Sequence, residues 1–318
     1  MILHQFPDLG WLQKQAREGF SAARDPRGVM LPQAGWPTVI LHTRSGQVHR
    51  DRIKGTLSVF CNLQGESRAT TQEAAASIHA RNFFLSNAGQ EYALSIEDRA
   101  ETFNIHFGEH FLNGLQDSLS LPDAQLLDMG REGAVGMMEF PNRSFWRNEA
   151  FDKAIAHLHA FSVAGSPDPL LEEELLAALA QVLLAETRQE HRNASGMRVS
   201  VATRLETQCR IHRAIDYLHS YFAHPLCLDE LAGIACMSKF HFLRSFRELI
   251  GHSPYQYLST VRIDYACYLL AYTEQPVTQI ALCSGFDNEV SFARAFRRKL
   301  GHSASQYRQL SKNGKVPA

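Results

Sequence analysis

Long apolar runs, paired cysteines and a basic leader are all absent from this 318-residue sequence. No apolar stretch approaches the 18 residues that suggest a membrane span, so we expect no contact with a membrane. The N-terminus has no basic segment followed by an apolar one, so we expect no secretory signal. The six cysteines form no Cys-x-x-Cys pair, which argues against a disulfide framework and a zinc cluster. We therefore expect reduced thiols and a cytoplasmic location.

A histidine pattern for metal chemistry is missing as well. No His-x-His occurs in the strand-like part of the chain, and His157-Leu158-His159 falls on a predicted helix. Other histidines of the first 110 residues are scattered, among them His42, His49, His79, His106 and His110. The sequence predicts no catalytic residues, no metal site and no cofactor, and hence not an enzyme.

Four large side chains in the first half have open interpretations. His106 points away from Phe103 and Ile105 if its strand is regular, so it either lines a pocket or lies at the surface, and we favour the surface. Three tryptophans are either pocket walls or core residues, and we favour the core: Trp11, Trp36 and Trp146. The effector-binding residues, if any, are not predicted.

The length suggests two domains, and the charge differs between them. Residues 1–195 carry 17 Lys/Arg and 24 Asp/Glu, a balance of −7, whereas residues 196–318 carry 15 and 9, a balance of +6. We predict a front domain over 1–195, a linker over 196–208, a second domain over 209–310 and a tail over 311–318. An excess of positive charge in the second domain favours a polyanionic partner.

The front domain is predicted to contain several strands followed by two helices. From about Asp51 to His110, clusters of β-branched and aromatic residues alternate with turn signals, which indicates a small barrel or sandwich. Two helices are predicted next, at roughly 146–161 and from Asp168-Pro169 onward. The second has a wide leucine face that packs on its own domain, on a second subunit, or on both.

The second domain repeats a phrase. SFRELIGHSPYQY starts at Ser245 and AFRRKLGHSASQY starts at Ala295, and seven of the thirteen aligned positions are identical. Upstream of each copy, over 228–249 and 277–300, the pattern predicts a short helix, a tight turn and a second helix, the helix-turn-helix plan. Ser238 and Asp287 are the expected N-caps of the two second helices. Gly285 suits the second turn, whereas Cys236 takes its place in the first and must strain or turn differently.

Both second helices have one apolar and one exposed face. Phe242, Phe246 and Leu249 share a face in the first copy, as do Phe292, Phe296 and Leu300 in the second. The opposite faces carry Phe240, Arg244 and Arg247, and Val290, Arg294 and Arg297. Arginine pairs bidentately with guanine and also with phosphate, so repeated arginines at the same helical position predict contact with DNA.

A helix from Pro254 to about Ala271 is predicted to join the two motifs. Two rigidly joined recognition helices can enter successive major grooves, which are about 34 Å apart. We therefore interpret the sequence repeat as two copies of one motif, each of which binds one major groove. We interpret the repeated Gly-His-Ser as a structural turn in which His252 and His302 stabilise the chain.

Residues from about Arg210 to Arg308 resemble the DNA-binding domain of the AraC/XylS family. The resemblance rests on RIHRAIDYL, LDELAGIACMS, FLRSFRELIGHSPYQYL, VRIDYACYLL, VTQIALCSGF and FARAFRRKLGHSASQYR. The chain departs from the family pattern at Cys236, usually glycine, and at Ala304, usually proline. A weaker likeness to a cupin-like barrel followed by two helices covers the front domain.

The resemblance implies a transcription regulator, which we expect to be an activator gated by a small-molecule effector or by dimerisation through its front domain. The expected partners are double-stranded promoter DNA, RNA polymerase and a second copy of the chain. The expected fold is an α+β cupin-like front domain and an all-α domain with two helix-turn-helix motifs. Base contacts are expected from Lys239, Phe240, His241, Arg244, Glu289, Val290, Ser291 and Arg294, and phosphate contacts from Arg247, Arg297, Arg298 and Lys299. Gating by a partner protein and a cupin enzyme with a DNA-binding tail are the alternatives.

Overall fold

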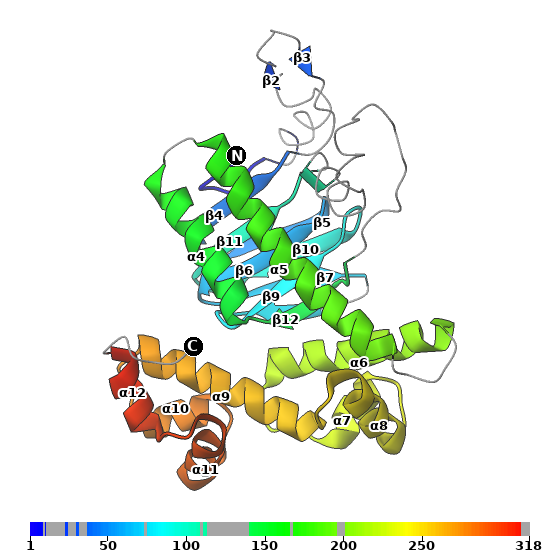
Figure 1. The fold of residues 1–318 in the computed structure, drawn as a ribbon, viewed down its shortest axis with the longest axis vertical. Coiled ribbons are helices and arrows are strands. Elements are labelled where there is room, and N and C mark those ends of the chain that lie inside the picture. Colours follow the sequence, from blue (N-terminus) through cyan, green and yellow to red (C-terminus); the bar gives the residue numbers. More distant parts are fainter. Residues whose placement is uncertain are drawn as a thin grey trace, which may run out of the picture. The chain divides into compact units, whose positions relative to one another are not determined.

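The computed structural model describes residues 1–8, 10, 23–24, 30–31, 37–72, 75–108, 111–112, 140–165, 168–195 and 201–312. The chain divides into two compact units, which are described separately (Figure 1). Unit 1 comprises Met1–Phe145 and Ala150–Leu184, and unit 2 comprises Trp146–Glu149 and Ala185–Ala318. Within the described ranges, no helix has the length and apolar character needed to cross a membrane.

Unit 1 contains two main sheets. The six-stranded sheet has the strand order β1 (Ile2–Leu3), β4 (Val39–Ser45), β11 (Ala100–His106), β6 (Ser58–Gln64), β9 (Asn82–Ser86) and β12 (Arg143–Trp146). The four-stranded sheet has the order β5 (Val48–Lys54), β10 (Glu91–Ile96), β7 (Ser67–Thr71) and β8 (Ala75–Ile78). A separate pair consists of β2 (Ala23–Arg24) and β3 (Met30–Leu31).

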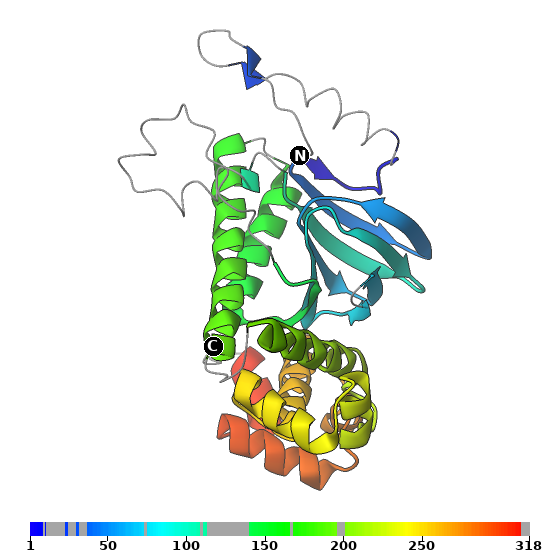
Figure 2. The same cartoon turned by 90° about the vertical axis from the view of Figure 1, so that its right-hand side faces the viewer.

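The sheets of unit 1 form layers because side chains alternate along each strand. In β6, Phe60 packs with residues of the four-stranded sheet, whereas Val59 and Cys61 pack on the opposite side against helices. Two helices cover that opposite side, α4 (Glu149–Ala164) and α5 (Pro169–Ser195) (Figure 2). In the described residues the two sheets are not hydrogen-bonded into a closed barrel, so the β part of unit 1 is a pair of open sheets.

Helix α5 begins where the sequence predicts. Asp168 Oδ1 accepts hydrogen bonds from the amides of Leu170 and Leu171 at 3.1 and 3.2 Å, and Pro169 follows as the first helical residue. The leucine face packs mainly on its own unit, since Leu176, Leu179 and Leu183 belong to the core under the sheet.

The far end of α5 differs from the expectation. Residues 190–195 are polar and without apolar periodicity, which is typical of a linker, yet they continue the helix. Residues 201–208, placed in the expected linker, form the first two turns of α6. Polar composition alone did not reveal these turns, because a polar sequence is compatible with helix as well as with loop.

Unit 2 is helical in its described part. Its helices are α6 (Val201–Tyr221), α7 (Leu228–Ile234), α8 (Lys239–Ile250), α9 (Pro254–Tyr272), α10 (Val277–Cys283), α11 (Glu289–Leu300) and α12 (Ala304–Lys312). They enclose two cores, one around α6–α8 and one around α10–α12. Helix α9 belongs to both, since Val261 lies in the first core and Ile263, Ala266 and Leu270 lie in the second.

One tryptophan packs against the first core of unit 2. The Trp146 ring lies 5.3 Å from that of His219 and 5.8 Å from that of Phe222, between ring centroids, in agreement with its interpretation as a core residue. Trp11 and Trp36 fall outside the described residues.

The repeated Gly-His-Ser phrase is a helix-to-helix turn. Gly251 ends α8 in the left-handed region at φ 81°, and Ser253 begins α9 by accepting a hydrogen bond from the Gln256 amide. The Gln256 side chain accepts in return from the Ser253 amide, which completes a capping box. The second copy repeats the box with Ser303 and Gln306. Glycine, serine and glutamine thus make this turn, while His252 and His302 are exposed.

Candidate functional site

Two helix-turn-helix units, α7–α8 and α10–α11, form the candidate site of unit 2. Their turns have the same hydrogen bonds: Cys236 N donates to Gly233 O at 2.9 Å, and Gly285 N donates to Leu282 O at 2.9 Å. Both residues have positive φ, 51° for Cys236 and 83° for Gly285. Of the two outcomes expected for Cys236, the structure shows the same turn as in the second motif, with strain at Cys236, rather than a different turn.

Gly285 has a further reason to lack a side chain. A Cβ atom built there would lie 2.8 Å from Phe222 O and 2.9 Å from the Cα of Ala223, closer than side chains approach backbone. Arg262 of α9 holds the same loop, because its Nε donates to Phe222 O at 2.8 Å and its Nη2 donates to His224 O at 2.9 Å. Arg262 is a positioning residue that the sequence analysis missed; its only signal is a cation within the largely apolar α9.

The second helices bury the predicted faces. Phe242 and Phe246 of α8 and Phe292 and Phe296 of α11 are fully buried. Leu249 is buried as well, while Leu300 is half-buried. These aromatic pairs fix the rotation of each helix on its core.

The opposite faces are exposed in both helices. Phe240 is 84% exposed and Val290 is 68% exposed, which is unusual for apolar side chains and suits contact with another molecule. Arg244 and Arg294 are exposed at the same position of the two helices. The remaining expected base-contacting residues, Lys239, His241, Glu289 and Ser291, are exposed in the first turn of one helix or the other.

Capping residues fix the start of each helix. Ser238 Oγ accepts from the His241 amide as predicted. In the second motif, Asn288 Oδ1 accepts from the Ser291 amide at 2.8 Å, so the expected cap at Asp287 is wrong by one residue. Aspartate and asparagine are equally good caps, and the sequence alone did not separate these neighbours.

Ion pairs hold some of the cations. Arg244 donates to Glu248 at 2.9 Å and Lys239 pairs with Asp229 at 2.7 Å. The hydrogen bond to Glu248 raises the pKa of the Arg244 guanidinium further, which keeps it charged. Both pairs are exposed and screened by solvent, so either cation can be released to a stronger anion.

The expected phosphate-contacting residues form two classes. Arg247, Arg297 and Arg298 are exposed. Lys299 instead pairs with Asp264 of α9 at 2.5 Å and donates to Thr260 O at 3.4 Å. Its charge is therefore partly neutralised within the protein.

Unit 1 contains a separate, largely apolar cavity of about 80 Å³ between its sheets. Phe6, Leu41, Phe60 and Leu94 are among its apolar walls, and Arg50, Lys54, Asn104 and His106 are among its polar ones. The favoured surface position of His106 is wrong, since this side chain lines the cavity. Space of this size holds several water molecules or part of a small organic molecule.

Two polar groups of the cavity are available to a ligand. Ser58 Oγ donates to Thr56 O at 2.9 Å and lies 2.8 Å from His106 Nδ1, so Nδ1 carries the imidazole proton and Nε2 is an acceptor. Burial lowers the pKa of His106 to about 4, which keeps the ring neutral. The buried Nδ2 of Asn104 has no hydrogen-bond partner among the described residues and is a free donor.

Comparisons with known proteins agree with the helix-turn-helix geometry. A family model described as a helix-turn-helix domain matches residues 231–310. The MmsAB operon regulatory protein of Pseudomonas aeruginosa is 35% identical over 104 residues, which are 31% of this chain and 34% of that protein. The match thus spans about a third of that relative's length.

Two solved structures are similar to parts of this chain. The DNA-binding domain of AdpA, solved in complex with a target DNA, is 30% identical, covers 33% of this chain and 96% of that one, and has a TM-score of 0.33. ToxT from Vibrio cholerae covers 86% of this chain and 97% of that one at 14% identity and a TM-score of 0.31. With the family match and the two motifs of matched geometry, residues 231–310 are a helix-turn-helix domain of the AraC type.

Proposed function

We propose that this chain is a sequence-specific DNA-binding transcription regulator that reads two adjacent major grooves with α8 and α11. The observation that carries the proposal is the matched exposed face of the two helices, with Arg244 and Arg294 at the same position above the same buried aromatic pairs. The relative from Pseudomonas aeruginosa is named as an operon regulator, which supports regulation as the outcome of binding.

The position of each arginine along its recognition helix predicts whether it contacts bases or phosphates. Arg244 and Arg294 lie in the first half, where a recognition helix meets base edges, and each can donate two hydrogen bonds to guanine O6 and N7. Arg247, Arg297 and Arg298 lie further along and contact phosphate, which fixes register without reading sequence. Helix α9 contributes to both cores and so holds the two readers at a fixed spacing.

Unit 1 gates this activity in our proposal, which makes the protein an effector-dependent activator that works with RNA polymerase in the cytoplasm. The support is the cavity, whose free donor on Asn104 and acceptor on His106 suit a small, largely apolar molecule with one polar end. Arg50 and Lys54 would favour an anionic end. Dimerisation through the leucine face of α5 and gating by a partner protein stay predictions, although Leu171, at the start of that face, is 40% exposed.

Selection of binding sites from a random duplex library with the full-length chain tests the proposal. We expect two enriched boxes about one helical turn apart, and we expect Arg244→Ala and Arg294→Ala each to relax one box at about 1–3 kcal/mol. Arg213→Ala, which removes an exposed cation of α6, is the matched control and should leave both boxes intact. Binding that depends on salt but enriches no sequence, with or without candidate effectors, would contradict sequence-specific reading.

A further inference from the structure

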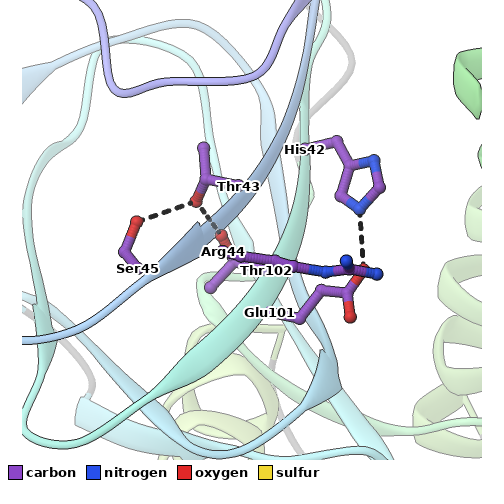
Figure 3. A network of polar contacts seen from close by, with 6 residues as sticks. All are labelled: His42, Thr43, Arg44, Ser45, Glu101 and Thr102. Carbon is purple, nitrogen blue, oxygen red and sulfur yellow. Dashed lines mark hydrogen bonds and ion pairs between the residues drawn. The ribbon is translucent and has the colours of Figure 1, made fainter.

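One polar cluster interrupts the apolar core between the six-stranded sheet and the helices of unit 1. It consists of His42 on β4, Glu101 on β11 and His159 on α4, whose candidate ligand atoms all lie within 4.8 Å of one another. His42 Nε2 and Glu101 Oε1 are 2.9 Å apart (Figure 3). Glu101 is buried, with only 8% of its side chain exposed, and His42 has 10% exposed. Buried ionisable groups are rare unless they are paired or bind a metal, so the cluster requires an explanation.

Strand register and helix packing bring the three residues together. His42 lies opposite Phe103, and Arg44 lies opposite Glu101, so His42 and Glu101 are diagonal neighbours on the helix-covered face. His159 reaches the same place from α4, and its ring centroid is 4.9 Å from that of His42. The arrangement links residues up to 117 positions apart in the chain, from 42 to 159.

The hydrogen bonds of the cluster are incomplete. His42 Nδ1 and His159 Nε2 are buried and have no hydrogen-bond partner in the described part of the chain. Leaving a buried polar atom without a partner costs free energy, so two such nitrogens in one cluster call for an explanation, and a bound ion is one that satisfies both. An unprotonated imidazole nitrogen is the commonest protein ligand for a metal ion.

Arg44 supplies the positive charge that Glu101 needs when no ion is bound. Its Nη2 lies 3.1 Å from Glu101 Oε1, yet 76% of its side chain is exposed, so it can leave without breaking the core. A bound cation would replace Arg44 as the partner of the carboxylate. Arg44 and the ion are therefore competitors, which gives the cluster a property that a purely structural ion pair lacks.

We propose that His42, Glu101 and His159 form a binding site for a divalent transition-metal ion of the zinc type. Two imidazoles and one carboxylate are a ligand set that zinc accepts, with water completing its coordination. Ligands about 2.0–2.2 Å from one ion lie about 3.4 Å apart. The ligand atoms here lie within 4.8 Å of one another, so the longest separation closes by up to about 1.4 Å through side-chain rotation. The ion would join β4, β11 and α4, and would lock the sheet to its helical cover. This site lies apart from the cavity, because His42 and Glu101 point to the helix side of the sheet and His106 to the other.

Calorimetric titration of the chelator-treated full-length chain with zinc chloride alone tests the proposal without DNA. We expect one saturable equivalent that EDTA reverses. Since losing even an outer partner of a metal ligand lowers affinity about 10–100-fold, we expect His42→Ala, Glu101→Gln and His159→Gln each to lower it at least about tenfold. His157→Gln is the matched control, since it removes an exposed histidine from the same helix.

Arg44→Gln separates a metal site from a structural ion pair. We expect this variant to bind zinc several-fold more tightly, because the competing cation is gone, and to fold normally, as circular dichroism will check. Equal affinity of His159→Gln and His157→Gln would overturn the proposal, as would zinc binding that disappears when the cysteine thiols are blocked. Should His42→Ala fail to fold, Arg44→Gln and the less buried His159→Gln still decide the matter.

Discussion

At the scale of single residues, His106 is a titratable group that its cavity keeps neutral. Its Nδ1–H donates a hydrogen bond to Ser58 Oγ, and burial in the cavity disfavours the positively charged imidazolium form. The structure thus keeps Nε2 as an acceptor at physiological pH. This property is a consequence of burial, and it ties the stability of unit 1 to pH.

We expect His106→Gln to flatten the stability of unit 1 between pH 6.5 and pH 4. The pKa of an unfolded histidine is about 6.5 and that of folded His106 is about 4, so in this window the unfolded chain binds a proton that the folded chain does not. The contribution of neutral His106 to the free energy of unfolding is therefore fully present above pH 6.5. It is lost as the pH drops towards 4, by about 1–3 kcal/mol in total. Urea unfolding of the wild type and the variant at pH 7 and pH 5 measures the difference, and parallel losses in both proteins would contradict it.

At the scale of elements, the two helix-turn-helix motifs make the same tight turn with different residues. Each short helix must turn sharply into its recognition helix through a left-handed residue. Gly285 meets this requirement without strain and leaves room for Phe222 O, whereas Cys236 adopts the same region at a cost of about 1–2 kcal/mol.

We expect opposite effects from exchanging the small residues of these turns. Gly285→Ala should lower the free energy of unfolding by about 2–4 kcal/mol, because it combines left-handed strain with a Cβ atom only 2.8 Å from Phe222 O. Cys236→Gly should raise it by about 0.5–1 kcal/mol, since relief of strain exceeds the extra entropy of glycine in the unfolded chain. Guanidinium unfolding followed by circular dichroism tests both. A destabilised Cys236→Gly would mean that the thiol makes contacts that outweigh the strain.

At the scale of the whole molecule, opposite charge balances are combined in one chain of net charge −1. Residues 196–318 carry a net charge of +6, which attracts phosphate groups, whereas residues 1–195 carry a net charge of −7. An acidic front part limits non-specific binding to nucleic acid, so that affinity depends on the exposed cations of the two helix-turn-helix motifs.

We expect the salt dependence of DNA binding to distinguish those cations. Arg297→Ala and Arg298→Ala should each reduce the slope of log K against log salt by about 1, because each removes one phosphate contact. Lys299→Ala should reduce it less, since Asp264 already neutralises this lysine. Fluorescence anisotropy of the full-length chain on labelled duplex over a range of salt provides the slopes. Equal changes for Lys299 and Arg298 would show that the lysine leaves Asp264 when DNA binds.

The sequence by itself determined most of unit 2. The motifs α7–α8 and α10–α11 span 228–250 and 277–300, within one residue of the predicted 228–249 and 277–300, because caps, left-handed glycines and aromatic residues spaced by four are local signals. Those same signals fix which face of each recognition helix is exposed. The candidate base-contacting residues therefore lie where the repeat predicts them.

Only the tertiary structure decided what unit 1 brings together. The chain shows His42, Glu101 and His159 as isolated polar residues, and nothing local shows that the register of β4 on β11 makes the first two neighbours. Strand pairing also decided that His106 faces a cavity and that the sheets stay open. The reason is physical: a shift of one residue moves every side chain of a strand to the other face, and contacts over tens of residues set that register.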